Sequence, residues 1–263
     1  MPTLTLCAKT YRDRQLRQIE PLLRAKLEDL KVNFKVRDAT SRGWVRVDLS
    51  GEDERVATNF LAKGVGLCST NLEGLRKFST AKACITAFGK SRDSSLSLDV
   101  GVYEPEVVDA TLRLSDLQAQ LCDGRKVALN RISQLYGFCD DYPLNVKIMS
   151  LDAVQKRVEV MLAETQLGQF SDWTDSLLDR LVVIGSSEDE VAVAVEKMGF
   201  VRDVVKIEPL GLLEHAIVCK LGTDAAGLIP RLGRCLPNTV FSVFSPRRLL
   251  EFFGEDSNLP ALS

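Results

Sequence analysis

The sequence has very little of the chemistry that metal sites and most hydrolytic active sites require. It holds one histidine, His215, and its seven cysteines are scattered, with no C-x-x-C pair. Zinc sites draw on clustered cysteine and histidine, and calcium loops on regularly spaced aspartates, and neither pattern is present. The glycine motifs G-x-x-x-x-G-K-[ST] and G-x-G-x-x-G are also absent. We therefore expect no metal and no bound cofactor.

Two further absences concern partners and location. The formal net charge is −2, so no overall basic field attracts nucleic acid, and such binding needs a local basic patch. No run of 18 apolar residues predicts a membrane span, and the start of the chain lacks the apolar core of a signal peptide. Scattered thiols, mostly inside apolar runs, are typical of a reducing compartment. These features predict a cytoplasmic protein.

The first 80 residues alternate between strand and helix patterns. Residues 3–11 alternate as a strand does, and leucines at helical spacing follow, with Pro21 placing the start of the regular helix near Glu20. Two alternating runs around a Ser-Arg-Gly turn predict a hairpin, and a second helix with an acidic first turn comes next. This β-α-β-β-α order, with one more strand to complete it, predicts a ferredoxin-like domain over residues 1–80.

Residues 168–263 repeat this arrangement. The pattern reads strand, helix, two strands, helix and strand, followed by a short helix and a polar tail. Val191, Val193 and Val195 alternate and also fit a strand, but a helix is the preferred interpretation. The full β-α-β-β-α-β series predicts a second ferredoxin-like domain.

Five short strands lie between these two regions, over residues 81–167. A helix-like insert separates the third strand from the fourth, which is the arrangement of an OB-fold barrel. Leu96, Leu98, Val100 and Val102 share one face and are expected to fill the barrel. The predicted fold class is therefore α+β, with an OB-fold barrel between two ferredoxin-like domains.

The middle segment resembles the S1-type RNA-binding OB domain. The features that carry the resemblance are Gly101 after the second strand, the turn Ser115-Asp116-Leu117, and the hairpin from Val146 to Leu162. The resemblance implies a ligand face on the second and third strands, where that family usually carries aromatic residues for base stacking. Here the second strand carries leucine and serine, and Phe88 and Tyr103 are the aromatic residues close to the expected face.

The whole chain also resembles an archaeal family known only as a domain of unknown function, DUF2110. The phrases "TSRGWVRV", "LGLLEHAIVCKLGTDAAG" and "DSLLDRLVVIG" carry this resemblance. It implies an archaeal cytosolic protein and supplies no activity.

Basic and aromatic residues gather around the predicted hairpin and the first loop of the barrel. An exposed tryptophan beside arginines suits base stacking and phosphate contact, whereas the alternative is a half-buried tryptophan with solvated arginines. The candidate nucleic-acid-binding residues are Lys9, Arg12, Arg37, Arg42, Trp44, Arg46, Phe88, Lys90, Arg92, Tyr103 and Arg113.

Two other places offer weaker candidates. Gly222 and Thr223 precede a helix whose free amides suit an anion, although Thr223 or Asp224 serves equally well as the helix cap. His215 and Cys219 share one face of a strand, but an isolated strand histidine is usually a buried, hydrogen-bonded one.

These patterns favour a non-catalytic protein that binds RNA or a ribonucleoprotein in translation or transcription, with RNA or a protein as its partner and no membrane. The first alternative is a protein–protein scaffold that uses the sheet of the third domain. The second is a regulatory protein that holds a small molecule at the "KLGTDAAG" turn, and an enzyme with His215 as base comes last. No oligomeric state follows from the sequence.

Overall fold

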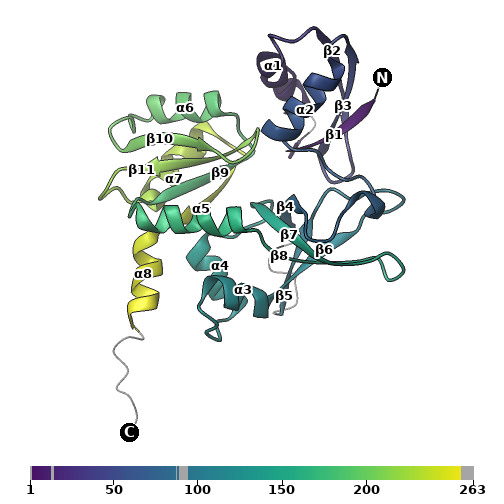
Figure 1. The fold of residues 1–263 in the computed structure, drawn as a ribbon. Helices are drawn as coiled ribbons and strands as arrows, with labels where there is room; N and C mark the ends of the chain where they lie inside the picture. Colours follow the sequence, from purple (N-terminus) through teal and green to yellow (C-terminus); the bar gives the residue numbers. More distant parts are fainter. Residues whose placement is uncertain (1, 13–14, 87, 89–93, 256–263) are drawn as a thin grey trace.

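The computed structural model describes residues 2–12, 15–86, 88 and 94–255 of the chain. Figure 1 shows three bodies built on β-sheets: an N-terminal sheet, a barrel in the middle and a C-terminal sheet. Among the described residues, none of the helices combines the length and the apolar character that crossing a membrane requires. The mixed α+β architecture with a central barrel agrees with the prediction.

The N-terminal body is a three-stranded antiparallel sheet in the order β1-β3-β2. Its elements are β1 (Thr3–Lys9), α1 (Leu16–Lys26), β2 (Val32–Ala39), β3 (Trp44–Gly51) and α2 (Glu54–Gly64). The strand expected to complete the sheet does not form. A single antiparallel bridge between Leu6 and Leu67 stands in its place at the outer edge of β1.

Helix α1 corrects the prediction made from Pro21. The helix begins at Leu16 and contains Pro21, rather than starting near Glu20. Ile19 and Leu23 lie one turn apart on either side of the proline and are fully buried in the N-terminal core. Their packing holds the segment helical, although Pro21 in the interior of the helix supplies no backbone donor for the i→i−4 hydrogen bond.

The middle body is a closed barrel with strand order β4-β5-β6-β8-β7, in which β6 and β8 are parallel. The elements are β4 (Thr80–Thr86), β5 (Ser95–Asp99), β6 (Asp109–Arg113), α3 (Leu114–Leu121), α4 (Leu129–Tyr136), β7 (Pro143–Asp152) and β8 (Arg157–Leu162). A 3₁₀ turn, η2 (Leu72–Gly74), precedes β4. The helix-like insert is the pair α3 and α4, so the barrel is OB-like, as predicted.

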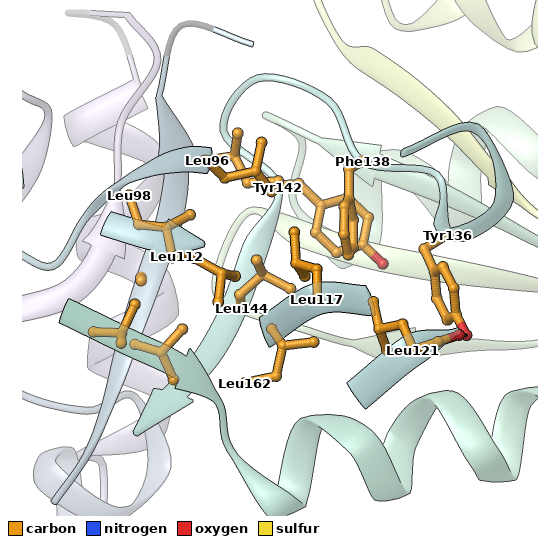
Figure 2. Packing of buried hydrophobic residues seen from close by; sticks show 14 of the residues in the cluster. Leu96, Leu98, Leu112, Leu117, Leu121, Tyr136, Phe138, Tyr142, Leu144 and Leu162 are labelled. Atoms are coloured by element: carbon orange, nitrogen blue, oxygen red, sulfur yellow. Dashed lines mark hydrogen bonds between the residues drawn. The ribbon is translucent and has the colours of Figure 1, made fainter. Parts of the chain in front are cut away.

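The barrel is filled by alternating apolar residues. Leu96, Leu98, Val100 and Val102 are all at most 2% exposed, which confirms their predicted structural role. Figure 2 shows Leu96 and Leu98 in the same cluster as Leu112, Leu144 and Leu162 from the other strands. Closure also leaves the barrel without unpaired strand edges.

Helix α5 (Glu164–Asp175) links the barrel to the C-terminal sheet, and the sequence patterns did not predict it. Its buried residues are Gln166, Phe170 and Trp173, so one of the three is polar and the apolar stripe is short. A helix with so narrow a stripe gives a weak periodic signal. In Figure 1 it runs between the barrel and the C-terminal sheet.

The C-terminal sheet has the order β10-β11-β9-β12, with all neighbours antiparallel. The elements are β9 (Arg180–Ile184), α6 (Glu188–Lys197), β10 (Val204–Pro209), β11 (Glu214–Cys219), α7 (Ala225–Cys235), β12 (Val240–Phe244) and α8 (Pro246–Glu255). One face packs under α6 and α7, whereas Val182, Ile184 and Phe244 on the other face join the barrel's cluster. The predicted helix over Val191–Val195 is confirmed. The exact domain boundaries stay predictions.

Candidate functional site

A groove of about 700 Å³ lies where the N-terminal sheet meets the barrel. The end of β1, the β2–β3 turn and residues 140–141 of the barrel form its walls. Arg12 and Arg42, two of the predicted binding residues, line it together with the hydroxyl groups of Thr10, Thr40 and Ser41. These are the side-chain types that contact nucleic-acid backbones.

The β2–β3 turn holds Arg42 against the end of β1 because of Gly43. Gly43 has φ 92°, and a Cβ there would lie 2.4 Å from the carbonyl oxygen of Thr10. The backbone N–H of Thr10 donates to the Gly43 oxygen at 2.8 Å, and the N–H of Gly43 donates to the Thr40 oxygen at 2.8 Å. Only glycine permits this approach, so the turn and the strand end form one rigid wall.

The two groove arginines are anchored by contacts outside their own domain. Arg12 Nη2 donates to the backbone oxygen of Asn238 in the C-terminal body at 2.7 Å. Arg42 Nη2 lies 3.3 Å from Asp109 Oδ2 of the barrel, and 39% of its side chain is exposed. Exposed ion pairs of this kind are weak, so a phosphate can compete for the Arg42 guanidinium.

Three carboxylates also line the groove, and each has its own partner. Asp38 binds the guanidinium of Arg46, Asp141 binds Lys9, and Asp140 accepts the backbone N–H of Phe88. The negative charge of Asp38 and Asp141 is therefore balanced within the protein. The contact with Asp140 fixes the backbone of Phe88, whose half-buried side chain packs against the apolar cluster of the barrel.

Lys9 is not the exposed phosphate contact that we predicted. It is 6% exposed, and its Nζ lies 2.7 Å from Asp141 Oδ1 and 3.6 Å from Asp99 Oδ2. Burial acts to lower the pKa of Lys9, but the surrounding Cys84, Asp141 and Asp99 raise it overall. Lys9 is thus a buried cation that neutralises carboxylates of the barrel.

Trp44 also departs from the prediction, since it is only 2% exposed. Its indole Nε1 donates to Asp99 Oδ1 at 2.8 Å, and the Lys9 ammonium lies 5.5 Å from its ring centroid. The indole therefore fastens the N-terminal sheet to the barrel and cannot stack on a base. An indole has both a large apolar surface and a donor, which suits this buried position.

The other predicted arginines of the described residues each form an ion pair. Arg37 pairs with Asp48, Arg46 with Asp38, and Arg113 with Glu159. The groove wall includes none of these three arginines. Arg46 lies next to the groove, because its partner Asp38 lines it, whereas Arg113 belongs to the separate patch expected on the barrel. A role of these three arginines in binding stays a prediction.

Tyr103 is half-buried and tied to β1 by a 3.0 Å hydrogen bond between its hydroxyl and that of Thr5. The outward face of β5 and β6 carries Ser97, Asp109 and Thr111, without the aromatic residues that stack bases in S1-type domains. Lys90 and Arg92 fall outside the described residues.

Gly222 and Thr223 line a separate hollow of about 780 Å³ next to α8. Asp224 caps α7 by accepting the N–H of Ala226 at 3.0 Å. Asp179 and Glu251 line the same hollow and oppose an anion, although Arg247, Arg248 and Lys220 lie there too. The structure thus agrees with the capping interpretation.

His215 is 2% exposed in β11. Burial lowers its pKa to about 4, so the imidazole is neutral at pH 7. Among the residues that the structure describes, no group of three or more histidine, cysteine, aspartate or glutamate side chains is placed to hold a metal ion.

A smaller cavity of about 190 Å³ lies behind the groove, where all three bodies meet. Lys9, Lys82 and Glu214 line it, with the amides of Gln166 and Gln169. The pKa of Glu214 is raised by burial, against the hydrogen bond that its Oε1 accepts from the Tyr11 hydroxyl. Sequence patterns missed this cavity because its residues come from segments far apart in the chain.

The structure thus defines an α+β protein in which a closed OB-like barrel lies between two sheet-and-helix domains. Residues 3–67 match the DUF2110 N-terminal domain, and residues 178–244 match the DUF2110 C-terminal domain. These two matches together span half of the chain, and the protein belongs to the DUF2110 family. A search of curated proteins found no match.

Solved structures give low similarity. The uncharacterized protein MJ1198 from Methanocaldococcus jannaschii is 10% identical, with 34% of this chain and 95% of that chain covered and a TM-score of 0.24. The intact alpha subunit of aIF2 from Pyrococcus abyssi is 9% identical over 65% of this chain and 97% of that chain, with a TM-score of 0.27. A chain of the a/eIF2alpha-aDim2p-rRNA complex from Pyrococcus horikoshii OT3 is 12% identical over 48% of this chain and 64% of that chain, with a TM-score of 0.27. Scores this low transfer no function.

Proposed function

We propose that this protein is a non-catalytic RNA- or ribonucleoprotein-binding protein that holds an RNA backbone in the groove between the N-terminal domain and the barrel. The observation that carries the proposal is the convergence of Arg12 and Arg42 with three hydroxyl side chains in a cleft of about 700 Å³. An RNA assembly of the archaeal cytoplasm, in translation or transcription, is the setting that suits this role.

The groove defines how the contact is made. Arg12 and Arg42 bind phosphates, and the hydroxyl groups of Thr40 and Ser41 donate to phosphate or ribose oxygens, whereas the hydroxyl of Thr10 donates to the Gly43 oxygen within the turn. Phe88, whose backbone N–H donates to Asp140 of the groove, is the candidate for stacking on a base. With two phosphate contacts the affinity is modest and falls with salt.

Two features support the remaining parts of the proposal. The neutral, buried His215 is a poor general base, which supports a protein without catalytic activity. The strand orders β1-β3-β2 and β10-β11-β9-β12, with helices between the strands, support ferredoxin-like folds for the two outer domains.

The test is a titration of fluorescent single-stranded RNA of mixed sequence, followed by anisotropy at several salt concentrations. We compare the wild type with R12A/R42A and with the control R55A/R202A, which removes two exposed arginines on α2 and after α6. Each phosphate contact to a single strand contributes about 0.7 to the slope of log K against log salt. The groove variant is therefore expected to lose roughly 1.4 from that slope, and the control almost nothing.

Two results would contradict the proposal. One is the absence of binding by the wild type at low salt. The other is an equal loss in both double variants, because that outcome reflects total charge rather than the groove. Circular dichroism of each variant checks that the fold is intact, since Arg12 also contacts Asn238.

The cavity of about 190 Å³ favours one alternative, a regulatory protein that binds a small molecule. Its volume and its amide and charged lining suit a compact polar ligand rather than a polymer. A thermal-shift screen of small polar metabolites tests this alternative. A hit that raises the melting temperature of the wild type but not of Q169A supports it.

A further inference from the structure

Two cysteines face each other at the edge of the N-terminal sheet. At the bridge between Leu6 and Leu67, the N–H of Cys7 donates to the Gly66 oxygen and the N–H of Cys68 donates to the Thr5 oxygen, both at 2.9 Å. The alternation of strand residues places both thiols on the same side of this bridge. Their Sγ atoms lie 3.4 Å apart.

Cys68 also packs closely against the barrel. A Cβ at Gly101 of the barrel would lie 2.6 Å from the Cβ of Cys68 and 2.7 Å from its Sγ. The barrel therefore lies against Cys68, and only a glycine at position 101 leaves room for it. A disulfide has an S–S distance of about 2.05 Å, so small rotations about the cysteine side-chain bonds close the gap.

Cys7 is also accessible from a cavity, and the pKa values of the two cysteine thiols differ. Cys7 and Lys82 both line the cavity of about 190 Å³, and both cysteines are only partly buried. The hydrogen bond between Cys7 and Cys68 and the charge of Lys82 lower the pKa of Cys7 against the effect of burial, whereas the pKa of Cys68 is raised by the same hydrogen bond and by burial. A thiol with the lower pKa is the usual first nucleophile of such a pair.

We propose that Cys7 and Cys68 are a redox modification site that forms a reversible intramolecular disulfide on exposure to a peroxide. The Cys7 thiolate attacks one oxygen of hydrogen peroxide, the O–O bond breaks, and a sulfenic acid and hydroxide form. The Cys68 sulfur then attacks the Cys7 sulfur, the S–O bond breaks, and hydroxide leaves. With the two thiol protons taken up as water, one peroxide and two thiols give one disulfide and two waters.

The disulfide would fasten the segment after α2 to β1, next to the hydrogen bond between Thr5 and Tyr103 of the barrel. Cys7 and Cys68 are 61 positions apart in the chain, and a cross-link that closes a long loop restricts the unfolded chain strongly. Oxidation is therefore expected to raise the unfolding midpoint of the N-terminal domain. RNA binding plays no part in this proposal.

The experiment treats the purified, reduced protein with a small excess of hydrogen peroxide and measures intact mass, followed by non-reducing peptide mapping. The expected product has lost two hydrogens, contains one cross-linked peptide that joins Cys7 to Cys68, and returns to the starting mass with dithiothreitol. C7S and C68S are expected not to form it. C235S, which removes a partly buried thiol on α7, is expected to form it as the wild type does.

The proposal is overturned if no peptide joins Cys7 to Cys68 while Cys7 oxidises directly to sulfinic acid. It is also overturned if C68S forms a two-hydrogen product at the wild-type rate, since another pair would then react. Unfolding curves of C7S and C68S confirm that each variant is folded before oxidation is measured.

Discussion

On its C-terminal side the barrel presents aromatic rings, and on its N-terminal side it presents carboxylates. The ring of Phe244 of the C-terminal sheet lies 6.1 Å from that of Tyr136 on α4 of the barrel and 5.3 Å from that of Trp173 on α5, in the same cluster as the barrel leucines. On the opposite side, Asp99 and Asp141 meet Lys9, which is the only buried lysine among the described residues.

This difference separates two kinds of interface. Aromatic contacts bury apolar surface, so they stabilise in proportion to area and join the barrel and the C-terminal sheet into one core. Buried ion pairs add little net stability, but breaking one partner is costly, so they favour a single arrangement of the two domains. The groove and the small cavity both lie along the polar junction. Both are lined by charged side chains, and the groove is also lined by residues with hydroxyl groups.

The two tryptophans provide separate reporters for these interfaces. Trp44 lies in the polar junction and Trp173 in the aromatic one. A Trp44→Phe background leaves Trp173 as the sole indole, and a Trp173→Phe background leaves Trp44. Unfolding in denaturant, followed by fluorescence in each background, measures the two sides independently.

The largest effect is expected from Phe244→Ala. Phe244 is fully buried between α5 and the C-terminal sheet, so its truncation leaves a cavity that costs about 3–5 kcal/mol. The free energy of unfolding reported by Trp173 should fall by that amount, and the barrel and the C-terminal sheet should unfold together.

Leu49→Ala is the matched control, because Leu49 is equally buried but belongs to the N-terminal core. It should move the transition reported by Trp44 more than that reported by Trp173. If Phe244→Ala splits the Trp173 transition into two steps, the barrel and the C-terminal sheet are separate units and the shared core is not cooperative.

Lys9→Met is expected to have the next largest effect. It leaves the 1% exposed Asp99 without its cation, and removing one member of a buried ion pair costs about 3 kcal/mol or more. The free energy of unfolding reported by Trp44 should fall by this amount. The double variant K9M/D99N should recover part of the loss, because the asparagine side chain is uncharged and its oxygen still accepts from Trp44. Equal stability of K9M and wild type would show that the junction is not desolvated.

The smallest effect concerns pH. His215 titrates at about 4 in the folded protein, below its usual value of 6.5, because of burial. As the pH falls from about 6.5 to about 4, the unfolded chain takes up a proton that the folded protein does not, so stability falls by roughly 2–3 kcal/mol. Urea unfolding at several pH values should show this loss through Trp173, and His215→Leu should reduce it.

The stability contributed by Lys9 behaves in the opposite way. Its pKa is raised in the folded state, so its contribution is complete below the usual lysine pKa and is lost only as the pH rises through the folded value. Protonation of His215 in acid should therefore weaken the C-terminal sheet, whereas the charge of Lys9 itself does not change in that pH range. Acid loss that is unchanged in His215→Leu would assign the effect to other groups.

Much of the fold was predictable from local patterns. The alternation of apolar and polar residues predicted the barrel strands. Leu96 and Leu98, two positions apart, point to the same side of the strand, and both are buried in the barrel. Helix α5 was not predicted, because the buried Gln166 interrupts its apolar stripe. Helix α1 begins at Leu16, before the start predicted from Pro21, because the packing of Ile19 in the core stabilises the helix ahead of the proline.

The candidate site was predictable only in part. Arg12 and Arg42 were identified, because basic residues near a hairpin turn are visible in the sequence. The burial of Trp44 was not, because it depends on Asp99, which lies 55 positions away and reads as an ordinary strand residue. Pairings between distant segments, such as Cys7 with Cys68, have no local signature.

The most direct test of the proposed function is amide hydrogen exchange of the wild-type protein with and without single-stranded RNA. We predict protection at residues 9–12 and 38–43, the walls of the groove, with little change on α8 or on the outward face of β5 and β6. Protection that is confined to those other surfaces, or absent from the groove at saturating RNA, would contradict the proposal.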